Sequence, residues 1–275
     1  MKTKVFYILI IYFIFHNFKN VDIKNRILSN EIYINPYLYL KSLKKVVYTV
    51  LLGKYDNIHP IIKEKDYDYF MFTDQLLDTK TNNNWTIMKL DPKIIFSNIS
   101  DRKKKIKTQR YYKTHPHLFF KNYDLSIYID ASYEIRGQLN DFLLRILTPN
   151  KSIYILEHPE RNNIYNESNA VVILLKDINK ITIPIIKRYK KEKFPDDNGL
   201  AETCLIVRKH NDLKCINFME KWFQEIKNNS HRDQLSFNYI FWKLGNKIVK
   251  YIPKNYALKY FMQHTYHLIN YTFQS

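Results

Sequence analysis

The chain has 275 residues, of which 45% are hydrophobic and 25% are charged, and its formal net charge at pH 7 is +18. This length and composition support a full hydrophobic core, which excludes a globally disordered protein. The charge invites a nucleic-acid interpretation, but the basic residues are spread out, with no arginine-rich tract and no recognisable nucleic-acid module. We therefore expect no nucleic-acid partner, and a small anionic ligand needs only a few of these cations.

The N-terminus carries an apolar run, Val5–Phe15, behind two lysines. The run is short for a bilayer span and matches the hydrophobic region of a signal peptide, but no small-x-small cleavage site follows it. Residues 1–18 are therefore predicted to form a signal anchor, which implies membrane association and, in a eukaryotic host, a secretory or Golgi-like location. The open alternative is a hydrophobic segment packed on the domain of a cytoplasmic protein. Residues 19–45 are polar and are predicted to be a stem or linker.

The remaining residues, 46–275, are predicted to form one α/β domain. Val46–Leu52 is a continuous apolar run bounded by Gly53, which is typical of a buried strand. Further strands are predicted at 69–72, 85–90, 127–130, 152–156, 200–207 and 248–252. Helices are predicted at 101–113, after 132 to 147, within 163–193 with a break near Pro184, at 212–227 and after 234. This alternation indicates a mostly parallel sheet flanked by helices.

Asp130 ends the strand of the segment SIYIDAS and is followed by two small residues, Ala131 and Ser132. In open α/β sheets, ligands bind in the crevice beyond the carboxyl ends of the strands. One carboxylate at that place can hold a divalent cation against a phosphate. The alternative is that Asp130 caps the helix that follows. Residues after the first two strands are expected to line the same crevice: Gly53, Tyr55, Asp56 and Asp74.

Other charged residues come close to predicted strand ends. The helix at 101–113 has a basic face that includes Lys107, and because it leads into the Asp130 strand, its cations are candidates for contact with a diphosphate. His158 and Arg161 follow the strand at 152–156, and arginine suits bidentate contact with phosphate. A lone histidine is more often structural. Glu202 lies early in the strand at 200–207.

Two further segments carry possible site residues. Ser230–Gln234, with the sequence SHRDQ, opens a helix, and its acid and amide are capping residues by default. His264 and His267 have a spacing that would place both on one helix face and allow metal binding, but their aromatic surroundings favour packing. Cys204 lies in an apolar run and is most simply a core thiol.

Together, several of these segments resemble one known family. YTVLLGKYD, DYFMFTD, LFFKNYDLSIYIDAS, EHPERNNIYNES, NGLAETCLIVRKHN and SHRDQLSFNYIFWK occur in this order. Over residues 46–253 the chain resembles the family catalogued as domain of unknown function 616, the TOD1/MUCI70 glycosyltransferase-like domain of plant mucilage and pollen-turgor proteins. His-Pro-x-Arg followed by Arg-Asp-Gln is the specific part of the pattern.

The resemblance implies a GT-A-like transferase. Such an enzyme moves a sugar from a nucleotide-diphospho-sugar to a glycan, lipid or protein acceptor, and the pattern favours retention over inversion. GT-A folds usually hold Mn²⁺ or Mg²⁺ on an Asp-x-Asp. Here the matching place reads Asp130-Ala131-Ser132, so the second acid is missing. Asp233 and Gln234, with Asn238, resemble a pattern that lies beside donor and acceptor in several retaining families.

The resulting assignment is as follows. The expected catalytic residues are Asp233, Gln234, His158 and Glu202. The expected donor-binding residues are Gly53, Tyr55, Asp56, Asp74, Lys107, Arg161, Arg232 and Ser132. The expected metal ligands are Asp130 and His264. Two other functions stay open: a ceramidase-like lipid amide hydrolase with zinc on Asp130, His158 and His264, and an inert nucleotide-sugar-binding scaffold.

Overall fold

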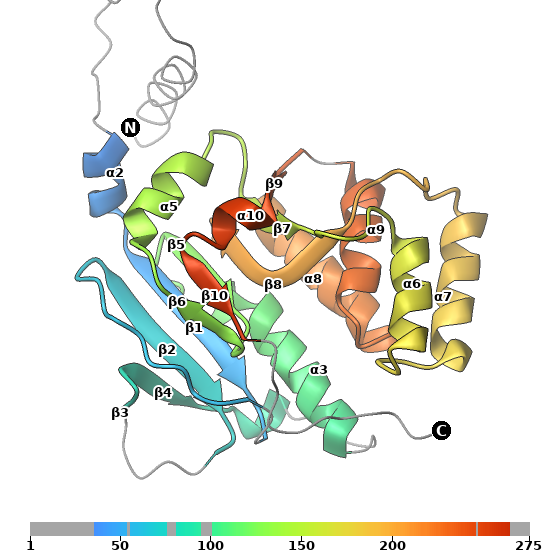
Figure 1. Cartoon of the computed structure of the whole chain (residues 1–275), viewed down its shortest axis with the longest axis horizontal. Helices are drawn as coiled ribbons and strands as arrows, with labels where there is room; N and C mark the ends of the chain where they lie inside the picture. The colour runs from blue at the N-terminus through green and yellow to red at the C-terminus, as the bar shows by residue number, and fades with distance from the viewer. Residues whose placement is uncertain (1–35, 54–55, 76–80, 95–100, 246, 265–275) are drawn as a thin grey trace, which may run out of the picture.

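The computed structural model describes residues 36–53, 56–75, 81–94, 101–245 and 247–264, and a central eight-stranded sheet runs through them (Figure 1). The strand order is β3-β4-β2-β1-β5-β8-β7-β9. The strands are β1 (Lys45–Leu51), β2 (Tyr67–Thr73), β3 (Thr81–Asn82), β4 (Trp85–Lys89), β5 (Leu125–Ile129), β7 (Ile153–Glu157), β8 (Ala201–Arg208) and β9 (Val249–Ile252). A separate two-stranded sheet pairs β6 (Tyr133–Ile135) with β10 (Phe261–Gln263).

Strand direction explains where the ligand site forms. In the described part of the chain, β1, β2, β4, β5, β7 and β9 run one way, and β3 and β8 run against them. The carboxyl ends of β1, β2, β5 and β7 therefore meet the amino end of β8 at one edge of the sheet. This topology confirms the predicted fold, a mixed, mostly parallel sheet flanked by helices.

Helices cover both faces of the sheet (Figure 1). They are α2 (Pro36–Ser42), α3 (Asp101–Thr114), α4 (Pro116–Phe119), α5 (Leu139–Ile146), α6 (Ile164–Ile173), α7 (Asn179–Lys191), α8 (Leu213–Asn228), α9 (Gln234–Leu244) and α10 (Lys254–Ala257). Alternate residues of β1 point to opposite faces. Val46, Tyr48 and Val50 join the core with α3, α8 and α9, whereas Val47 and Leu51 join the core with α5 and α10.

One predicted helical segment differs from the structure in the position of its break. The break in 163–193 lies between α6 and α7, where Leu175 has a φ of 53°, and not at Pro184, which lies inside α7. A left-handed residue ends a helix as firmly as a proline does, but the sequence gives little sign of it at a leucine. His264 follows strand β10, so it does not lie on the helix face that its spacing to His267 would have allowed. His267 lies outside the described residues.

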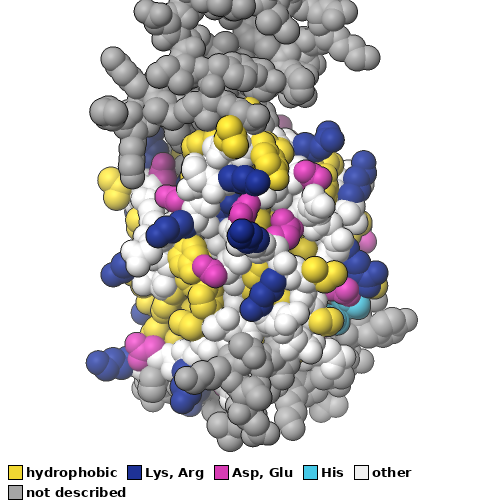
Figure 2. Space-filling view, turned by 90° about the vertical axis from the view of Figure 1, so that its left-hand side faces the viewer, with side chains coloured by type: hydrophobic (Ala, Val, Ile, Leu, Met, Phe, Trp, Pro, Cys, Tyr) yellow, Lys and Arg dark blue, Asp and Glu magenta, His cyan; other side chains and the backbone are white. Residues whose placement is uncertain are grey.

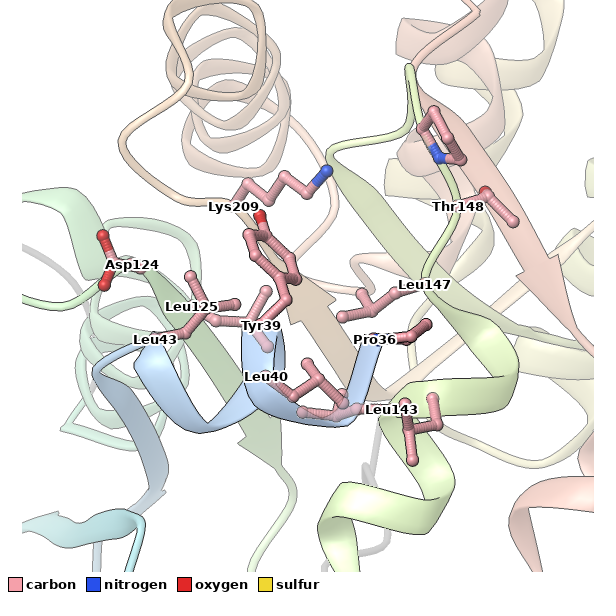
Figure 3. Close-up of a pocket in the computed structure, with 12 residues that line it drawn as sticks. Pro36, Tyr39, Leu40, Leu43, Asp124, Leu125, Leu143, Leu147, Thr148 and Lys209 are labelled. Carbon is pink, nitrogen blue, oxygen red and sulfur yellow. The ribbon is translucent and has the colours of Figure 1, made fainter. Parts of the chain in front are cut away.

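The described part of the predicted linker packs on the domain. Leu40 of α2 is only 2% exposed, and the ammonium of Lys45 donates hydrogen bonds to the carbonyls of Leu40 and Leu43. An apolar cavity of about 230 Å³ lies between α2, α5 and the start of β5 (Figure 3). Its wall includes Tyr39 and Leu143. Residues 36–45 are therefore integrated into the domain by burial and hydrogen bonding.

The described helices are all too short or too polar to cross a membrane. Residues 1–18 lie outside the described residues, so the signal anchor stays a prediction. On the face shown in Figure 2, Lys and Arg side chains are scattered among acidic and hydrophobic ones. That face lacks the continuous basic patch that is typical of nucleic-acid interfaces.

The docking of α2 gives a first prediction. Leu40→Ala should lower the free energy of unfolding by about 2–4 kcal/mol, because it removes a buried side chain and leaves a cavity. The matched control is Leu38→Ala in the same helix, where the side chain is 60% exposed and the effect should stay below about 0.5 kcal/mol. Urea unfolding of the full chain measures both. Equal effects would show that α2 is not part of the cooperative domain.

Candidate active site

A cleft with a volume of about 570 Å³ opens at the edge where the strand ends meet. This volume lies within the range of small-molecule sites. The sequence-predicted residues that line it are Asp56, Asp130, Ser132, His158, Arg161, Glu202, Arg232, Asp233 and Gln234. They come from the ends of β1, β5 and β7, the start of β8 and the start of α9. The sheet thus brings together residues that are far apart in the sequence.

Asp130 is held at the end of β5 by a chain of hydrogen bonds. The Gln109 amide donates to the Tyr128 hydroxyl (2.5 Å), which donates to Oδ1 of Asp130 (2.5 Å). The backbone N–H of Asp130 donates to the carbonyl of Cys204. Helix α5 begins only at Leu139, so Asp130 is no helix cap. Within the described residues, Oδ2 of Asp130 accepts no hydrogen bond, which leaves one carboxylate oxygen for a ligand.

Lys113, the buried cation of α3, lies below Asp130. Its ammonium is 2.6 Å from Oδ2 of Asp233 and 3.7 Å from Oδ1 of Asp130, and it donates to the Thr203 hydroxyl at 3.2 Å. Nε of Arg110 lies 3.3 Å from the same Asp233 oxygen. A fully buried lysine is costly unless it is paired. Lys113 therefore ties α3 to the start of α9 and to β8 beneath the cleft.

These cations determine the protonation of Asp233. Burial alone would raise the pKa of its carboxyl, but Arg110 and Lys113 together lower it well below its ordinary value. The side chain is 2% exposed. Asp233 is therefore a permanent anion that holds two cations, and such a carboxylate is a weak base.

The side of α3 that faces the cleft is not the side that the sequence predicted. Arg102, Lys105, Ile106, Gln109 and Arg110 line the cleft. They follow helical spacing on a side about 100° from the predicted face. Lys107 lies outside the cleft, because its ammonium donates to the carbonyl of Lys227 at the end of α8 (2.6 Å). The structure therefore does not bring Lys107 into the cleft with the other predicted donor-binding residues.

His158 and Arg161 form a compact unit after β7. The Nδ1 atom of His158 accepts the backbone N–H groups of Glu160 and Arg161, and Nε2 lies 3.0 Å from the guanidinium of Arg161. Nε of Arg161 donates to Glu167 at 2.6 Å. Burial, reinforced by Arg161, lowers the pKa of His158 to about 4. The ring is neutral at pH 7, so its geometry favours positioning the loop and Arg161 over donating a proton.

Glu202 reaches the cleft through an irregularity in β8. Opposite β7, the register jumps from Ile155–Ile206 to Leu156–Glu202, so the intervening residues of β8 bulge. Oε1 of Glu202 accepts the ammonium of Lys254 at 2.7 Å. Its other oxygen, Oε2, is buried and has no hydrogen-bond partner among the described residues. An unpaired carboxylate oxygen at a cleft wall is suited to accept a ligand hydroxyl.

Two of the predicted residues at the rim of the cleft, Gly53 and Asp74, are bonded to each other. Gly53, with a φ of 68°, donates its N–H to Oδ1 of Asp74 at 2.6 Å, and Lys105 lies 3.3 Å from Oδ2. The positive φ explains the need for glycine. Gly53 and Asp74 therefore shape the turn and position Lys105, which lines the cleft. Asp56 is buried at the cleft wall, and Tyr55 lies outside the described residues.

Asn238 has a structural role. Its Oδ1 accepts the N–H of Ala201 at 2.9 Å, and its Nδ2 donates to the Asn198 carbonyl and the Tyr251 hydroxyl. The side chain is fully buried. It joins α9 to the start of β8, so it is not available to a donor sugar. Gln234, by contrast, lines the cleft.

Two cations of the cleft form no close ion pair with the described residues. Arg232 and Lys176 both line the cleft, and neither has a carboxylate within 4.0 Å in the described part of the chain. Burial lowers the pKa of Lys176, and the neighbouring Arg232 lowers it further. The buried Nε of Arg232 also has no hydrogen-bond partner among these residues. Two neighbouring unpaired cations favour binding of an anion. Lys176, Lys254 and Lys113 were missed in the sequence because lysines are abundant everywhere in it.

The ring of His264 contacts Glu134 and His59 and forms no bond with Asp130. Its Nε2 is 2.9 Å from Oε2 of Glu134, and its ring stacks on that of His59. Its backbone N–H donates to the carbonyl of Ser132, which lines the cleft. Among the described residues, Asp130, His158 and His264 do not form a cluster whose ligand atoms share one ion.

The fold and the cleft define an α/β domain with a cleft at the carboxyl edge of a mostly parallel sheet. The chain belongs to the family described as TOD1/MUCI70, glycosyltransferase-like domain, whose model matches residues 28–270. That match confirms the resemblance found in the sequence. No curated protein matches the chain.

Two solved structures are similar to this one. The first is the WbbM bifunctional glycosyltransferase, with a TM-score of 0.45 and 12% identity over 77% of this chain and 39% of that chain. The second is mouse xyloside xylosyltransferase 1, with a TM-score of 0.41 and 9% identity over 76% of this chain and 85% of that chain. This chain therefore spans well under half of the length of the WbbM protein.

The buried ion pair gives a second prediction. Lys113→Met should lower the free energy of unfolding by about 3–5 kcal/mol, because it leaves a buried carboxylate short of its closest cation. Combining it with Asp233→Leu should recover part of this loss. The control is Lys105→Met, whose side chain is 50% exposed and whose loss should cost less than about 1 kcal/mol. Chemical denaturation measures all three, and a small effect of Lys113→Met would refute the anchoring role.

The neutral His158 gives a third prediction. Its folded pKa of about 4 lies below the ordinary value of 6.5, so between these pH values the unfolded chain binds the extra proton. The stabilisation is complete above pH 6.5 and is lost as the pH falls toward 4. His158→Gln should therefore flatten the rise of melting temperature between pH 4.5 and 6.5 relative to the wild type. Parallel curves for the two proteins would contradict the assigned neutral ring.

Proposed function

We propose that this chain transfers a sugar from a nucleotide-diphospho-sugar to a hydroxyl acceptor on a glycan, lipid or protein. The family membership supports a glycosyltransferase-like function. The observation that carries the proposal is the cleft itself, whose lining brings Asp130 after β5, Glu202 of β8 and the cations Arg232 and Lys176 to one space of nucleotide-sugar size.

Sugar transfer first requires that the negative charge on the leaving diphosphate be stabilised. Sugar transfer passes through an oxocarbenium-like state, and negative charge grows on the departing diphosphate. Preorganised cations at that place stabilise the transition state. Arg232 and Lys176 are the best candidates, because neither forms an ion pair in the described part of the chain. Arg161 is held beside them by Glu167 and adds a planar guanidinium that suits phosphate.

A divalent cation is the second component. Mg²⁺ and Mn²⁺ can be held by one carboxylate together with substrate phosphates and water, and Oδ2 of Asp130 is available for that contact. The residues present thus fit a cation that takes a single carboxylate ligand from the protein. When bound, it would offset diphosphate charge as a Lewis acid. Asp130 would hold it, while Tyr128 and Gln109 keep the carboxylate oriented.

The sugar and the acceptor need hydroxyl-binding groups. Oε2 of Glu202 is suited to accept a hydroxyl hydrogen bond, and Lys254 fixes the carboxylate through Oε1. Gln234 offers an amide at the mouth of α9. Asp233 acts indirectly in this scheme, by holding Lys113 and Arg110. A weak base at that position is compatible with retention of the anomeric configuration, which stays a prediction.

The same geometry bears on the two alternative functions, the lipid amide hydrolase and the inert scaffold. The hydrolase needs Asp130, His158 and His264 around one zinc ion, and the described residues do not cluster in that way. The inert scaffold shares the binding cleft and differs only in turnover. It is therefore an outcome of the experiment below.

The fourth prediction tests the donor. We expect one class among UDP-, GDP- and CDP-sugars to raise the melting temperature of the full chain, because a ligand that binds only the folded state stabilises it. Arg232→Gln should weaken that binding about tenfold or more. Asp130→Asn should reduce turnover, measured as released nucleoside diphosphate, by about 10²–10³-fold. Each measurement is made with and without Mn²⁺.

The matched control for these variants is Lys107→Gln. Lys107 lies on the same basic helix but bonds to Lys227 outside the cleft, so binding and turnover should not change. A donor shift without turnover on any acceptor would support the inert scaffold. No shift with any nucleotide sugar, or normal turnover of folded Asp130→Asn, would overturn the proposed function.

A further inference from the structure

Three potential metal ligands converge beside the cleft from separate segments. His59 comes from the loop after β1, Glu134 from β6, and His264 directly follows β10. One ligand atom from each lies within 4.8 Å of the other two. Among the described residues, no other group of three or more His, Cys, Asp and Glu side chains comes this close together. All three side chains are partly buried.

The spacing of these atoms suits a shared ion. Nε2 of His264 and Oε2 of Glu134 are 2.9 Å apart. Zinc binds imidazole nitrogen at about 2.0–2.1 Å and carboxylate oxygen at about 2.0–2.2 Å. Two ligands of one ion at those bond lengths lie roughly 3 Å or slightly more apart. The pair of Glu134 and His264 therefore already has nearly the separation that a common ion requires.

We propose that His59, Glu134 and His264 bind a borderline divalent ion of the zinc class. Two imidazole nitrogens and one carboxylate oxygen form a ligand set that zinc uses, with further positions left to water. Hard ions such as Mg²⁺ and Mn²⁺ prefer oxygen ligands. This site is separate in ligands and in metal class from the cation expected on Asp130.

The surroundings of Glu134 support this site. Nε and a terminal nitrogen of Arg136 donate hydrogen bonds of 3.0 and 3.1 Å to the two carboxylate oxygens of Glu134. Such an outer partner orients a ligating carboxylate.

Binding requires one local movement. The rings of His59 and His264 stack at 3.9 Å with an angle of 10° between their planes, and an ion cannot lie in both planes at once. The ring of His59 forms no hydrogen bond among the described residues, so its rotation gives up the stacking contact and breaks no hydrogen bond. His264 keeps its place, because its backbone N–H is bonded to Ser132.

The site is mechanically linked to the cleft. Gln263 precedes His264, and its side chain accepts the ammonium of Lys254, which also binds Glu202. Ser132 and Gln263 both line the cleft. An ion on the three ligands would therefore join the loop after β1, strand β6 and the chain after β10 into one wall.

The test is a titration of the full chain, first stripped of metal, with Co²⁺ as a spectroscopic probe and then with Zn²⁺. We expect one Co²⁺ per chain with the visible absorption of a nitrogen- and oxygen-bound ion of low coordination number, and displacement by Zn²⁺. Zn²⁺ should also raise the melting temperature. His59→Ala, Glu134→Gln and His264→Ala should each weaken Co²⁺ binding about 10–100-fold or more.

Controls separate this site from other metal binding. Asp130→Asn should keep the Co²⁺ spectrum, because Asp130 lies outside the cluster. His59→Ala is the variant least able to disturb the fold, since its ring has no hydrogen bonds to lose, and its melting temperature without metal confirms folding. Retention of the wild-type spectrum by folded His59→Ala, or no Co²⁺ binding by the wild type, would overturn the proposal. Neither outcome depends on sugar transfer.

Discussion

The buried ion pair between Lys113 and Asp233 holds the cleft together. Lys113 acts at both ends: its ammonium pairs with Asp233, and its carbonyl accepts hydrogen bonds from Tyr48 and Arg208. The last turn of α3 presents carbonyls with partial negative charge, which explains how the fully buried Arg208 is tolerated with no carboxylate partner among the described residues. One helix end thereby joins β1, β8 and α9. Breaking a buried pair costs several kcal/mol because the remaining charge is stranded, so these elements are fixed relative to each other.

The reversed strand β8 turns this anchored scaffold into a site. A wholly parallel sheet would offer only carboxyl ends at the ligand edge. Because β8 runs against its neighbours, its first residues reach that edge too, and the bulge opposite β7 lets Glu202 face the cleft while Cys204 still pairs with Asp130. The acid of β5 and the acid of β8 thus line one space. Their separation in the sequence is a consequence of the topology.

Features set by local chemistry were readable in the sequence. The buried strands, the acid at Asp130 and the turn at Gly53 follow from short apolar runs and from backbone freedom at one residue. The ligand-facing side of α3 was not readable, because every side of that helix carries lysine, and packing against α8 selects the side that is buried. The sequence pattern therefore pointed to Lys107, whereas Lys113 is the lysine of α3 that contacts Asp233 and lies near Asp130. The partners of His264 were also hidden, because β6 and β10 are short strands that pair across more than a hundred residues.

Charge pairing within the cleft shows what the ligand must supply. Most acids of the cleft already have a cation: Asp233 has Lys113, Glu202 has Lys254, and Glu167 has Arg161. Arg232 and Lys176 are left beside each other without a carboxylate within 4.0 Å in the described part of the chain, so Glu160 and Glu167 offset the charge of Lys176 only from a distance and a bound anion would relieve the repulsion further. A diphosphate carries that charge in compact form. Under the proposed function, and with Ser132 where a second acid of the metal motif would stand, Arg232 and Lys176 would provide much of the positive field for a leaving diphosphate.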